Sequence, residues 1–359
     1  MRASTSNGSK RGLEVWKRRA RKRLGAASDL ADKLVLTYDN TALTDGVGAQ
    51  LHRIYGIWAI SRLLGVPYRH SPINHVDYQG LTALETNSAD PAYHHEFNDV
   101  FRIESDPVSA DEFHTVTLAN LYPGQFRMLA TLVDLGKTRG KPILVRMKVP
   151  YGIADRFPDC YEACKEISPF DSPPRDGRPL RVAVHVRRGE QLVFLSDRLL
   201  PNAYYVNAAR SVAEVLDSAG LDYEIELWTE VATKEFTVYP SHHGMDERVK
   251  TASKVKPEMY PLDDFAVLPN LVHRINGRTI DCLRGLATAD ILIMSRSSFS
   301  YVAAILNRHG TVLFHPFWHQ APSSWVTAQP DGQFERSALT EALATAHTPS
   351  RPPSIESRR

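Results

Sequence analysis

The stretch RVAVHVRRGE, residues 181–190, places a short apolar strand directly before a cluster of charged side chains. Side chains alternate between the two faces of a strand, so its three valines, at every second position, share one face. His185 and Arg187 share the opposite face, and Gly189 then allows the backbone to turn. We therefore expect a buried strand whose carboxyl end presents an imidazole and a guanidinium at a functional edge.

Predicted strands and helices alternate along most of the chain. Short runs rich in β-branched residues predict strands, and apolar residues at helical spacing predict helices. Such alternation is typical of doubly wound parallel sheets, so the predicted fold class is α/β. The expected strands are 33–40, 67–73, 141–152, 181–187, 223–229, 290–295 and 310–315, and the expected helices are 51–66, 124–137, 201–219, 278–289 and 298–307.

The segment SPFDSPPRDGRP, residues 168–179, divides the chain, because four prolines exclude it from the interior of a helix or strand. A length of 359 residues also favours two domains over one. The sequence thus predicts a basic tail, two doubly wound domains and a disordered tail. Their expected bounds are 1–28, 29–170, 178–347 and 348–359.

The charge of the chain is unevenly distributed. The first 24 residues carry nine Lys or Arg and one Glu, which leaves about −6 for the rest, since the whole chain carries +2. A mildly acidic body excludes a general nucleic-acid-binding protein. The three cysteines are too few and too sparse for a disulfide framework and fit a reducing compartment.

Two interpretations of the basic N-terminal segment stay open. LEVWKRRARKRL, residues 13–24, can form an amphipathic helix that contacts an anionic membrane surface, or it can be a solvated, partly disordered tail. No apolar run approaches the roughly 20 residues that span a bilayer, and the start lacks the apolar region of a signal peptide. We expect a cytoplasmic location, with peripheral membrane contact as the alternative.

A second polar cluster follows the predicted strand in ADILIMSRSSFSYVAAILN, residues 289–307. Ser297 and Ser298 are natural N-caps, and the N-terminus of a helix binds phosphate through its free N–H groups without a metal. Both clusters lie where strands of one parallel sheet end, which is where ligands bind in such folds. Taken singly, each cluster is equally consistent with a structural role, as a buried His, paired arginines or a simple helix cap.

The turn DGVGAQ, residues 45–50, places Gly46 and Gly48 where the backbone can approach a sugar or phosphate, with Asp45 beside them. A tight connection between strand and helix explains the turn equally well. The third glycine of the dinucleotide fingerprint is missing, and the chain has no P-loop. The His-rich runs at 93–97 and 242–244 lack metal-ligand spacing, so no metal site is predicted.

Three motifs in this order resemble the superfamily of α-1,2-, α-1,6- and protein O-fucosyltransferases. HVRRGE resembles its HxRR motif, residues 289–307 resemble its later Ser-Ser-Phe-Ser segment, and DGVGAQLHRIYGIWAISRLLGV, residues 45–66, resembles its N-terminal GGxGNQ region. Glu190 and the sequence GAQ depart from the usual forms HVRRGD and GNQ. The resemblance implies a GT-B fold, in which an acceptor-side domain and a nucleotide-sugar-binding domain, both Rossmann-like, face each other across a cleft.

The resemblance also implies an activity: inverting, metal-independent transfer of fucose from GDP-fucose to a glycan or glycoconjugate acceptor, without a further cofactor. Two alternatives stay open. The chain can be a GT-B transferase that uses another nucleotide-sugar, or a catalytically silent protein that binds a nucleotide or a glycan.

Roles for individual residues follow from the same resemblance. Arg187 would contact the β-phosphate of the donor, and Arg188 would assist it or brace the loop. His185 and Asp290 would hydrogen-bond guanine or its ribose. Catalysis would involve Arg187, with Glu190 or Asp45 as the base, although Glu190 is equally consistent with a partner that holds Arg188. Further donor contacts are expected from Gly46, Gly48, Ser297, Ser298 and Phe299.

Overall fold

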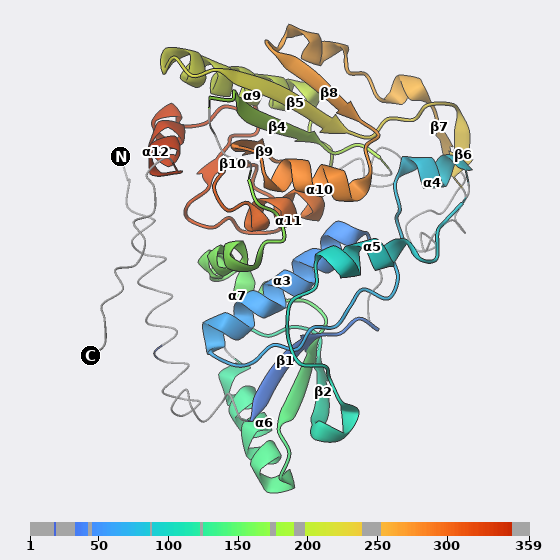
Figure 1. Cartoon of the computed structure of the whole chain (residues 1–359), viewed down its shortest axis with the longest axis vertical. Coiled ribbons are helices and arrows are strands. Elements are labelled where there is room, and N and C mark those ends of the chain that lie inside the picture. Colours follow the sequence, from blue (N-terminus) through green and yellow to red (C-terminus); the bar gives the residue numbers. More distant parts are fainter. Residues whose placement is uncertain are drawn as a thin grey trace.

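The computed structural model contains two parallel β-sheets with helices packed between and around them (Figure 1). Of the two predicted tails it describes only Arg18, and Glu190 also lies outside the described residues. Within the described part of the chain, no helix is long and apolar enough to cross a bilayer. The described residues are 18, 33–41, 45–86, 88–122, 125–172, 177–189, 198–238 and 253–346.

The smaller sheet is built from the N-terminal half of the chain. Its strands, in the order β1-β3-β2, are all parallel. The strand expected at 67–73 is only a single parallel bridge between Tyr68 and Leu36, because Pro67 and Pro72 have no N–H group to donate to a neighbouring strand. The strands are β1 (Leu34–Tyr38), β2 (His114–Leu118) and β3 (Ile143–Met147).

The larger sheet has six parallel strands in the order β11-β10-β9-β4-β5-β8. Numbered along the chain within this sheet, the order is 6-5-4-1-2-3, which is that of a doubly wound sheet. The strand order reverses between β4 and β9, because the chain adds strands on one side of β4 first and on the other side afterwards. The carboxyl ends of these two strands are therefore the place where a ligand is expected. The strands are β4 (Leu180–Val186), β5 (Tyr223–Thr229), β8 (Leu271–Ile275), β9 (Ile291–Ile293), β10 (Thr311–Phe314) and β11 (Val326–Thr327).

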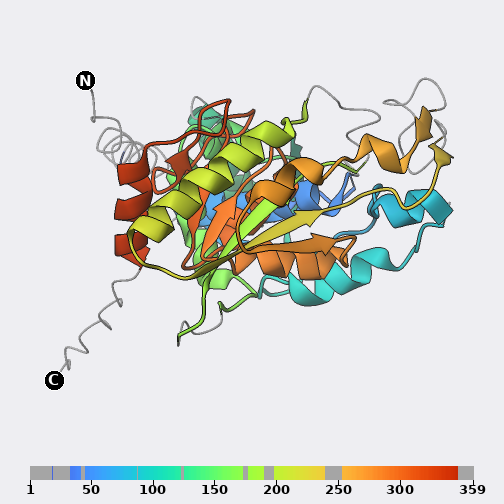
Figure 2. The ribbon, with the colours of Figure 1, turned by 90° about the horizontal axis from the view of Figure 1, so that it is seen from above.

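Helices cover both faces of the larger sheet (Figure 2), as the alternation of the sequence predicts. Helices α9 (Asn202–Ser218) and α12 (Arg336–Ala346) pack on one face, with the three valines of β4. Helices α10 (Thr279–Ala287) and α11 (Ser298–Leu306) pack on the other face, to which His185 also points through its ring contact with Phe299. The predicted alternation in β4 is thus confirmed.

Shorter elements surround the two sheets. The region 74–113 contains α4, α5 and η1, and a small antiparallel pair, β6 and β7, lies beyond β5. Their bounds, with those of the remaining helices, are α4 (Leu81–Thr86), α5 (Tyr93–Val100), α6 (Phe126–Arg139), α7 (Tyr151–Ala154), η1 (Ala110–Glu112), η3 (Pro158–Ile167), η5 (Pro257–Met259), η6 (Asp263–Val267), β6 (Phe236–Val238) and β7 (Ser253–Val255).

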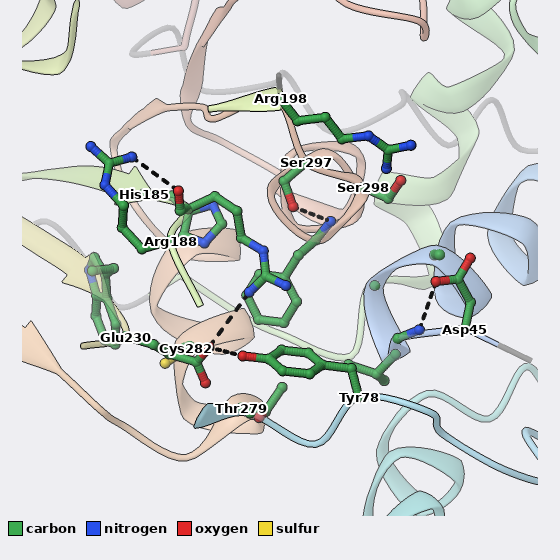
Figure 3. A pocket seen from close by; sticks show the side chains of 18 of the residues that line it. Asp45, Tyr78, His185, Arg188, Arg198, Glu230, Thr279, Cys282, Ser297 and Ser298 are labelled. Atoms are coloured by element: carbon green, nitrogen blue, oxygen red, sulfur yellow. Dashed lines mark hydrogen bonds and ion pairs between the residues drawn. The ribbon is translucent and has the colours of Figure 1, made fainter. Parts of the chain in front are cut away.

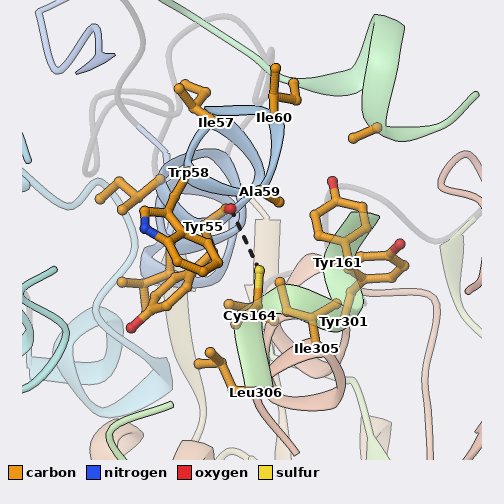
Figure 4. Close-up of a cluster of buried hydrophobic side chains, with 14 of the residues drawn as sticks. Tyr55, Ile57, Trp58, Ala59, Ile60, Tyr161, Cys164, Tyr301, Ile305 and Leu306 are labelled. Atoms are coloured by element: carbon orange, nitrogen blue, oxygen red, sulfur yellow. Dashed lines mark hydrogen bonds between the residues drawn. The ribbon is translucent and has the colours of Figure 1, made fainter. Parts of the chain in front are cut away.

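One hydrophobic core joins the two sheets through α3 (Val47–Leu64) and α11 (Figure 4). Tyr55 of α3 and Tyr301 of α11 are both fully buried in it, and the Cys164 thiol of η3 lies 3.6 Å from the carbonyl of Tyr55. The smaller sheet ends at Met147 and the larger begins at Leu180, so the Pro-rich segment lies between them. Whether each half is a domain that folds by itself stays a prediction, because the core is continuous.

Helix α3 and helix α11 touch at their first turns. A Cβ atom added to Gly48 would lie 2.5 Å from the Cα atom of Phe299, a distance that real Cβ atoms do not adopt. Gly48 is therefore required by this close approach of two helices, which accounts for it without any contact to a sugar.

We predict that Gly48→Ala lowers the free energy of unfolding by about 1–3 kcal/mol, because the added methyl must push the two helices apart. Gly46→Ala is the matched control, since a Cβ there meets only Tyr78, at 4.0 Å. Urea unfolding of both variants measures the difference. Equal costs for the two substitutions would contradict the role given to the α3–α11 contact.

Candidate functional site

A cavity of about 380 Å³ lies at the carboxyl ends of β4 and β5, against the first turns of α3 and α11 (Figure 3). Residues from both halves of the chain line it, as the predicted GT-B-like arrangement requires. The structure brings together nine of the eleven predicted site residues: Asp45, Gly46, Gly48, His185, Arg187, Arg188, Ser297, Ser298 and Phe299.

Two helix N-termini face this cavity. Helix α3 begins after Gly46, which has an extended backbone and no side chain that could cap the helix. Helix α11 begins after Ser297, whose hydroxyl accepts a hydrogen bond of 3.1 Å from the N–H of Phe299. Each N-terminus carries partial positive charge and N–H groups directed outward. Their convergence from opposite sides favours an anionic ligand such as a diphosphate.

Arg187 extends into the same cavity and is held there by two neighbours. Its guanidinium lies over the Tyr78 ring, 5.2 Å from the centroid, and its Nη1 atom lies 3.6 Å from Oε2 of Glu230. The Tyr78 hydroxyl donates to the same carboxylate oxygen over 2.8 Å. Gly189, with φ of 52°, is needed directly after the arginines, since a Cβ there would lie 2.7 Å from the Tyr78 hydroxyl.

Arg188 braces the loop after β4, which is one of the two roles expected for it, the other being to assist Arg187 in contacting the donor. It is 6% exposed, and its guanidinium donates to the Asn202 side chain and, over 3.1 Å, to the carbonyl of Arg187. The same group lies 5.7 Å from the ring centroid of Tyr205. These contacts tie the loop after β4 to the start of α9 and thereby fix the direction of Arg187.

His185 is a neutral, buried imidazole. Burial, with the Arg187 charge as a second cause, lowers the pKa of His185 to about 3. Its ring lies 5.4 Å from that of Phe299, and within the part of the chain described here its Nδ1 atom has no hydrogen-bond partner. Nδ1 is itself buried, so it is an unsatisfied polar atom beside the cavity and is not open to a ligand in this arrangement.

Asp45 has its carboxylate engaged. Arg53 donates to one oxygen over 2.8 Å, and the N–H of Gly46 donates to the other over 2.9 Å. These bonds fix the entry to α3, and they make Asp45 a weaker candidate for a base than its place at the cavity suggests. Because Glu190 lies outside the described residues, its role as the base stays a prediction.

Asp290 does not reach the cavity, and the expected contact with guanine or ribose is corrected. Asp290 directly precedes β9 and so lies at the amino edge of the parallel sheet, opposite to the site. Its carboxylate accepts from Arg178 over 2.7 Å and from the backbone N–H of Arg181 over 2.9 Å, and the residue is 4% exposed. It is a structural anchor of β4 and β9.

Several cavity residues were not assigned to the donor site from the sequence. Glu230 follows the predicted strand 223–229 by one residue, so the argument applied to the two recognised clusters also identifies it. Neither Arg198 nor Trp318 directly follows a predicted strand, so the sequence does not identify them. The fold brings them together, with the Arg198 guanidinium 4.6 Å from the ring centroid of Trp318. The other unassigned lining residues with side chains able to contact a ligand include Arg53, Asp77, Tyr78, Tyr151, Trp228, Thr229, Thr279 and Cys282.

Metal-ligating side chains do not gather at this site. Among the residues that the structure describes, no three His, Cys, Asp or Glu side chains come close enough to hold a metal ion. Independence from metal stays a prediction, because a diphosphate can itself supply ligands to a cation.

The chain resembles two solved structures at low sequence identity. No protein-family model matches the chain, and no curated protein sequence matches it. Among solved structures, E. coli ADP-heptose LPS heptosyltransferase II has a TM-score of 0.34 at 11% identity, covering 88% of this chain and 98% of its own. E. coli heptosyltransferase WaaC with ADP has a TM-score of 0.36 at 12% identity, covering 88% and 99%. Likeness at this level does not establish a shared function.

We predict that His185 stays neutral between pH 8 and pH 5, because burial and the neighbouring guanidinium both disfavour the imidazolium form. The ring-nitrogen chemical shifts of the histidines, assigned with a His185→Gln variant, report its protonation directly. A titration midpoint near the ordinary value of about 6.5 would contradict the buried environment described above.

Asp290→Asn is expected to lower the free energy of unfolding by about 2 kcal/mol, because the Arg178 charge loses its buried partner. Asp281→Asn is the matched control: it breaks an exposed pair with Arg284, for which less than about 1 kcal/mol is expected. The affinity of folded protein for GDP should stay within about threefold of wild type in both variants. A larger selective loss in Asp290→Asn would restore Asp290 to the binding site.

Proposed function

We propose that this chain is a glycosyltransferase that moves a sugar from a nucleoside diphosphate-sugar to a hydroxyl group of an acceptor. The observation that carries the proposal is the convergence of two helix N-termini and Arg187 on one cavity. This cavity lies where the strand order of the larger sheet reverses. Departure of the diphosphate places negative charge at this point. Fixed N–H groups and a guanidinium stabilise that charge, and they supply the role that a divalent cation has in metal-dependent transferases.

The specific donor that we propose is GDP-fucose, with inversion at the sugar carbon and without a metal or other cofactor. Its support is the resemblance of HVRRGE and of residues 289–307 to fucosyltransferase motifs. Of the two residues expected to contact the nucleoside, His185 lines the cavity, whereas Asp290 lies at the other edge of the sheet. Another nucleotide-sugar is the alternative, and a panel of donors distinguishes the two.

For the acceptor we propose a glycan or glycoconjugate that enters beside Trp318. The indole is 42% exposed and lies at the cavity under the Arg198 guanidinium, so its face and edge offer a surface on which a sugar ring can pack. A cytoplasmic enzyme whose basic N-terminal segment contacts an anionic membrane would meet lipid-linked acceptors. Sedimentation of the full chain with anionic vesicles tests that contact.

The second candidate is a catalytically silent protein that retains nucleotide binding. The observation that favours it is that both carboxylate oxygens of Asp45 already accept a hydrogen bond, one from Arg53 and one from the N–H of Gly46, which makes this carboxylate a weaker base toward an acceptor hydroxyl. Such a protein binds GDP and releases no GDP from any donor. Mass spectrometry of reactions with GDP-fucose and mixed glycan acceptors separates the two candidates.

Calorimetric titration of GDP in the presence of EDTA tests the donor site. We expect binding by the wild type and a roughly 30- to 1,000-fold loss in Arg187→Ala, because charge-assisted contacts to phosphate are removed. Arg210→Ala, an exposed position on α9 away from the cavity, should leave the affinity unchanged.

Two results would contradict this proposal. Absence of binding for GDP, UDP and ADP alike would remove the nucleotide site. Binding that appears only when a divalent cation is added would remove the metal-independent part and would leave a nucleotide site with a different phosphate contact.

A further inference from the structure

Glu230 is the one acidic residue that directly follows a strand of the larger sheet among the residues described, and its carboxylate lines the cavity (Figure 3). Its side chain is 26% exposed. Oε2 accepts from the Tyr78 hydroxyl and pairs with Arg187, whereas Oε1 has no hydrogen bond within the described residues. One oxygen thus fixes the side chain, and the other is open to a ligand.

Two glycines enclose this carboxylate. A Cβ on Gly80 would lie 2.7 Å from Oε1, and a Cβ on Gly189 would lie 2.9 Å from Oε2. Both glycines have positive φ, at 100° and 52°. Neither position has room for a side chain, so the backbone packs closely on both sides of the carboxylate and limits the movement of Glu230.

The chemistry of a carboxylate restricts what it can contact here. Glu230 lies 3.6 Å from Arg187, the residue proposed to hold the diphosphate, so its ligand must be a group adjacent to the phosphates. Phosphate itself is excluded, because two anions in contact repel each other. A carboxylate only accepts hydrogen bonds, so the adjacent group must donate them. Vicinal hydroxyls are the donors that a nucleotide-sugar carries beside its phosphates.

The topology selects between the two sugars of the donor. In dinucleotide-binding domains of this strand order, the loop after the first strand approaches the phosphates, and an acidic side chain further along the chain accepts a hydrogen bond from a ribose hydroxyl. In this sheet β4 is the first strand and β5 is the second, and Glu230 follows β5. Trp228, Thr279 and Cys282 line the cavity with it and provide a wall for the nucleoside.

We propose that Glu230 recognises the ribose of the nucleotide by accepting hydrogen bonds from its 2′- and 3′-hydroxyls, and that it makes the site selective for ribonucleotides. This inference rests on the proposed function, since it places a nucleoside diphosphate in the cavity. It adds a group that neither the sequence motifs nor the comparisons assign.

The test is calorimetric titration of the full chain with GDP and 2′-deoxy-GDP. We expect wild type to bind 2′-deoxy-GDP about 10- to 100-fold more weakly than GDP, as loss of a hydrogen bond to a charged acceptor implies. Glu230→Gln should reduce that ratio to about threefold or less, because a neutral amide oxygen is a weaker acceptor. The ratio is the readout, since freeing Arg187 changes the affinity for both nucleotides together.

Two further variants separate ribose recognition from the structural role of Glu230. Tyr78→Phe removes the hydrogen bond to Oε2 and keeps the ring beside Arg187. We therefore expect this variant to keep the wild-type ratio of the affinities for GDP and 2′-deoxy-GDP. Glu85→Gln changes a carboxylate that bonds Thr233 outside the cavity, and it should leave both affinities unchanged.

Three outcomes overturn the inference. A wild-type ratio near one, with GDP binding still dependent on Arg187, removes ribose recognition and leaves the proposed function intact. An unchanged ratio in Glu230→Gln assigns the selectivity to another residue. Absence of binding by wild type for GDP, UDP and ADP alike removes the proposed function and the inference with it. If UDP or ADP binds in place of GDP, only GDP is removed as the donor nucleotide, and the 2′-deoxy form of the nucleotide that binds carries the same comparison.

Discussion

The contact between the first turns of α3 and α11 is the constraint on which the rest of the structure depends. It places the smaller sheet against the larger through a single shared core, and Gly48 permits it because no other residue leaves room for the backbone of Phe299. The same contact directs both helix N-termini at one cavity. Packing and electrostatics are therefore two results of one arrangement: the residue that allows the helices to meet also concentrates positive potential where a diphosphate is proposed to bind.

The charges around the cavity are arranged in fixed pairs with separate tasks. Arg188 and Asp45 are engaged with neighbours and hold the two loops, whereas Arg187 stands in the cavity between Tyr78 and Glu230. His185 contributes no charge, since burial keeps it neutral. Tyr78 and Glu230 come from opposite halves of the chain, so their hydrogen bond also ties the halves together across the cavity.

Much of the larger sheet follows from local sequence. The alternating valines of β4 and the Ser-Ser start of α11 identify these elements and their exposed ends, since strand period and helix caps are local properties. The strand β8 gave no such signal, because its residues are half-exposed or exposed and show no apolar alternation. Strand polarity alone argues against Asp290 at the site, and its expected role came from the resemblance. Contacts such as Tyr78 with Glu230 join residues 152 positions apart, and no local pattern predicts them.

A crystal structure of the chain with GDP in the presence of EDTA tests the central claim most directly. We predict density for the diphosphate between the first turns of α3 and α11, with the β-phosphate within hydrogen-bonding distance of the Arg187 guanidinium and of the N–H groups at the start of α11. GDP bound elsewhere on the protein, or bound in the cavity with its phosphates away from Arg187 and α11, would contradict the account.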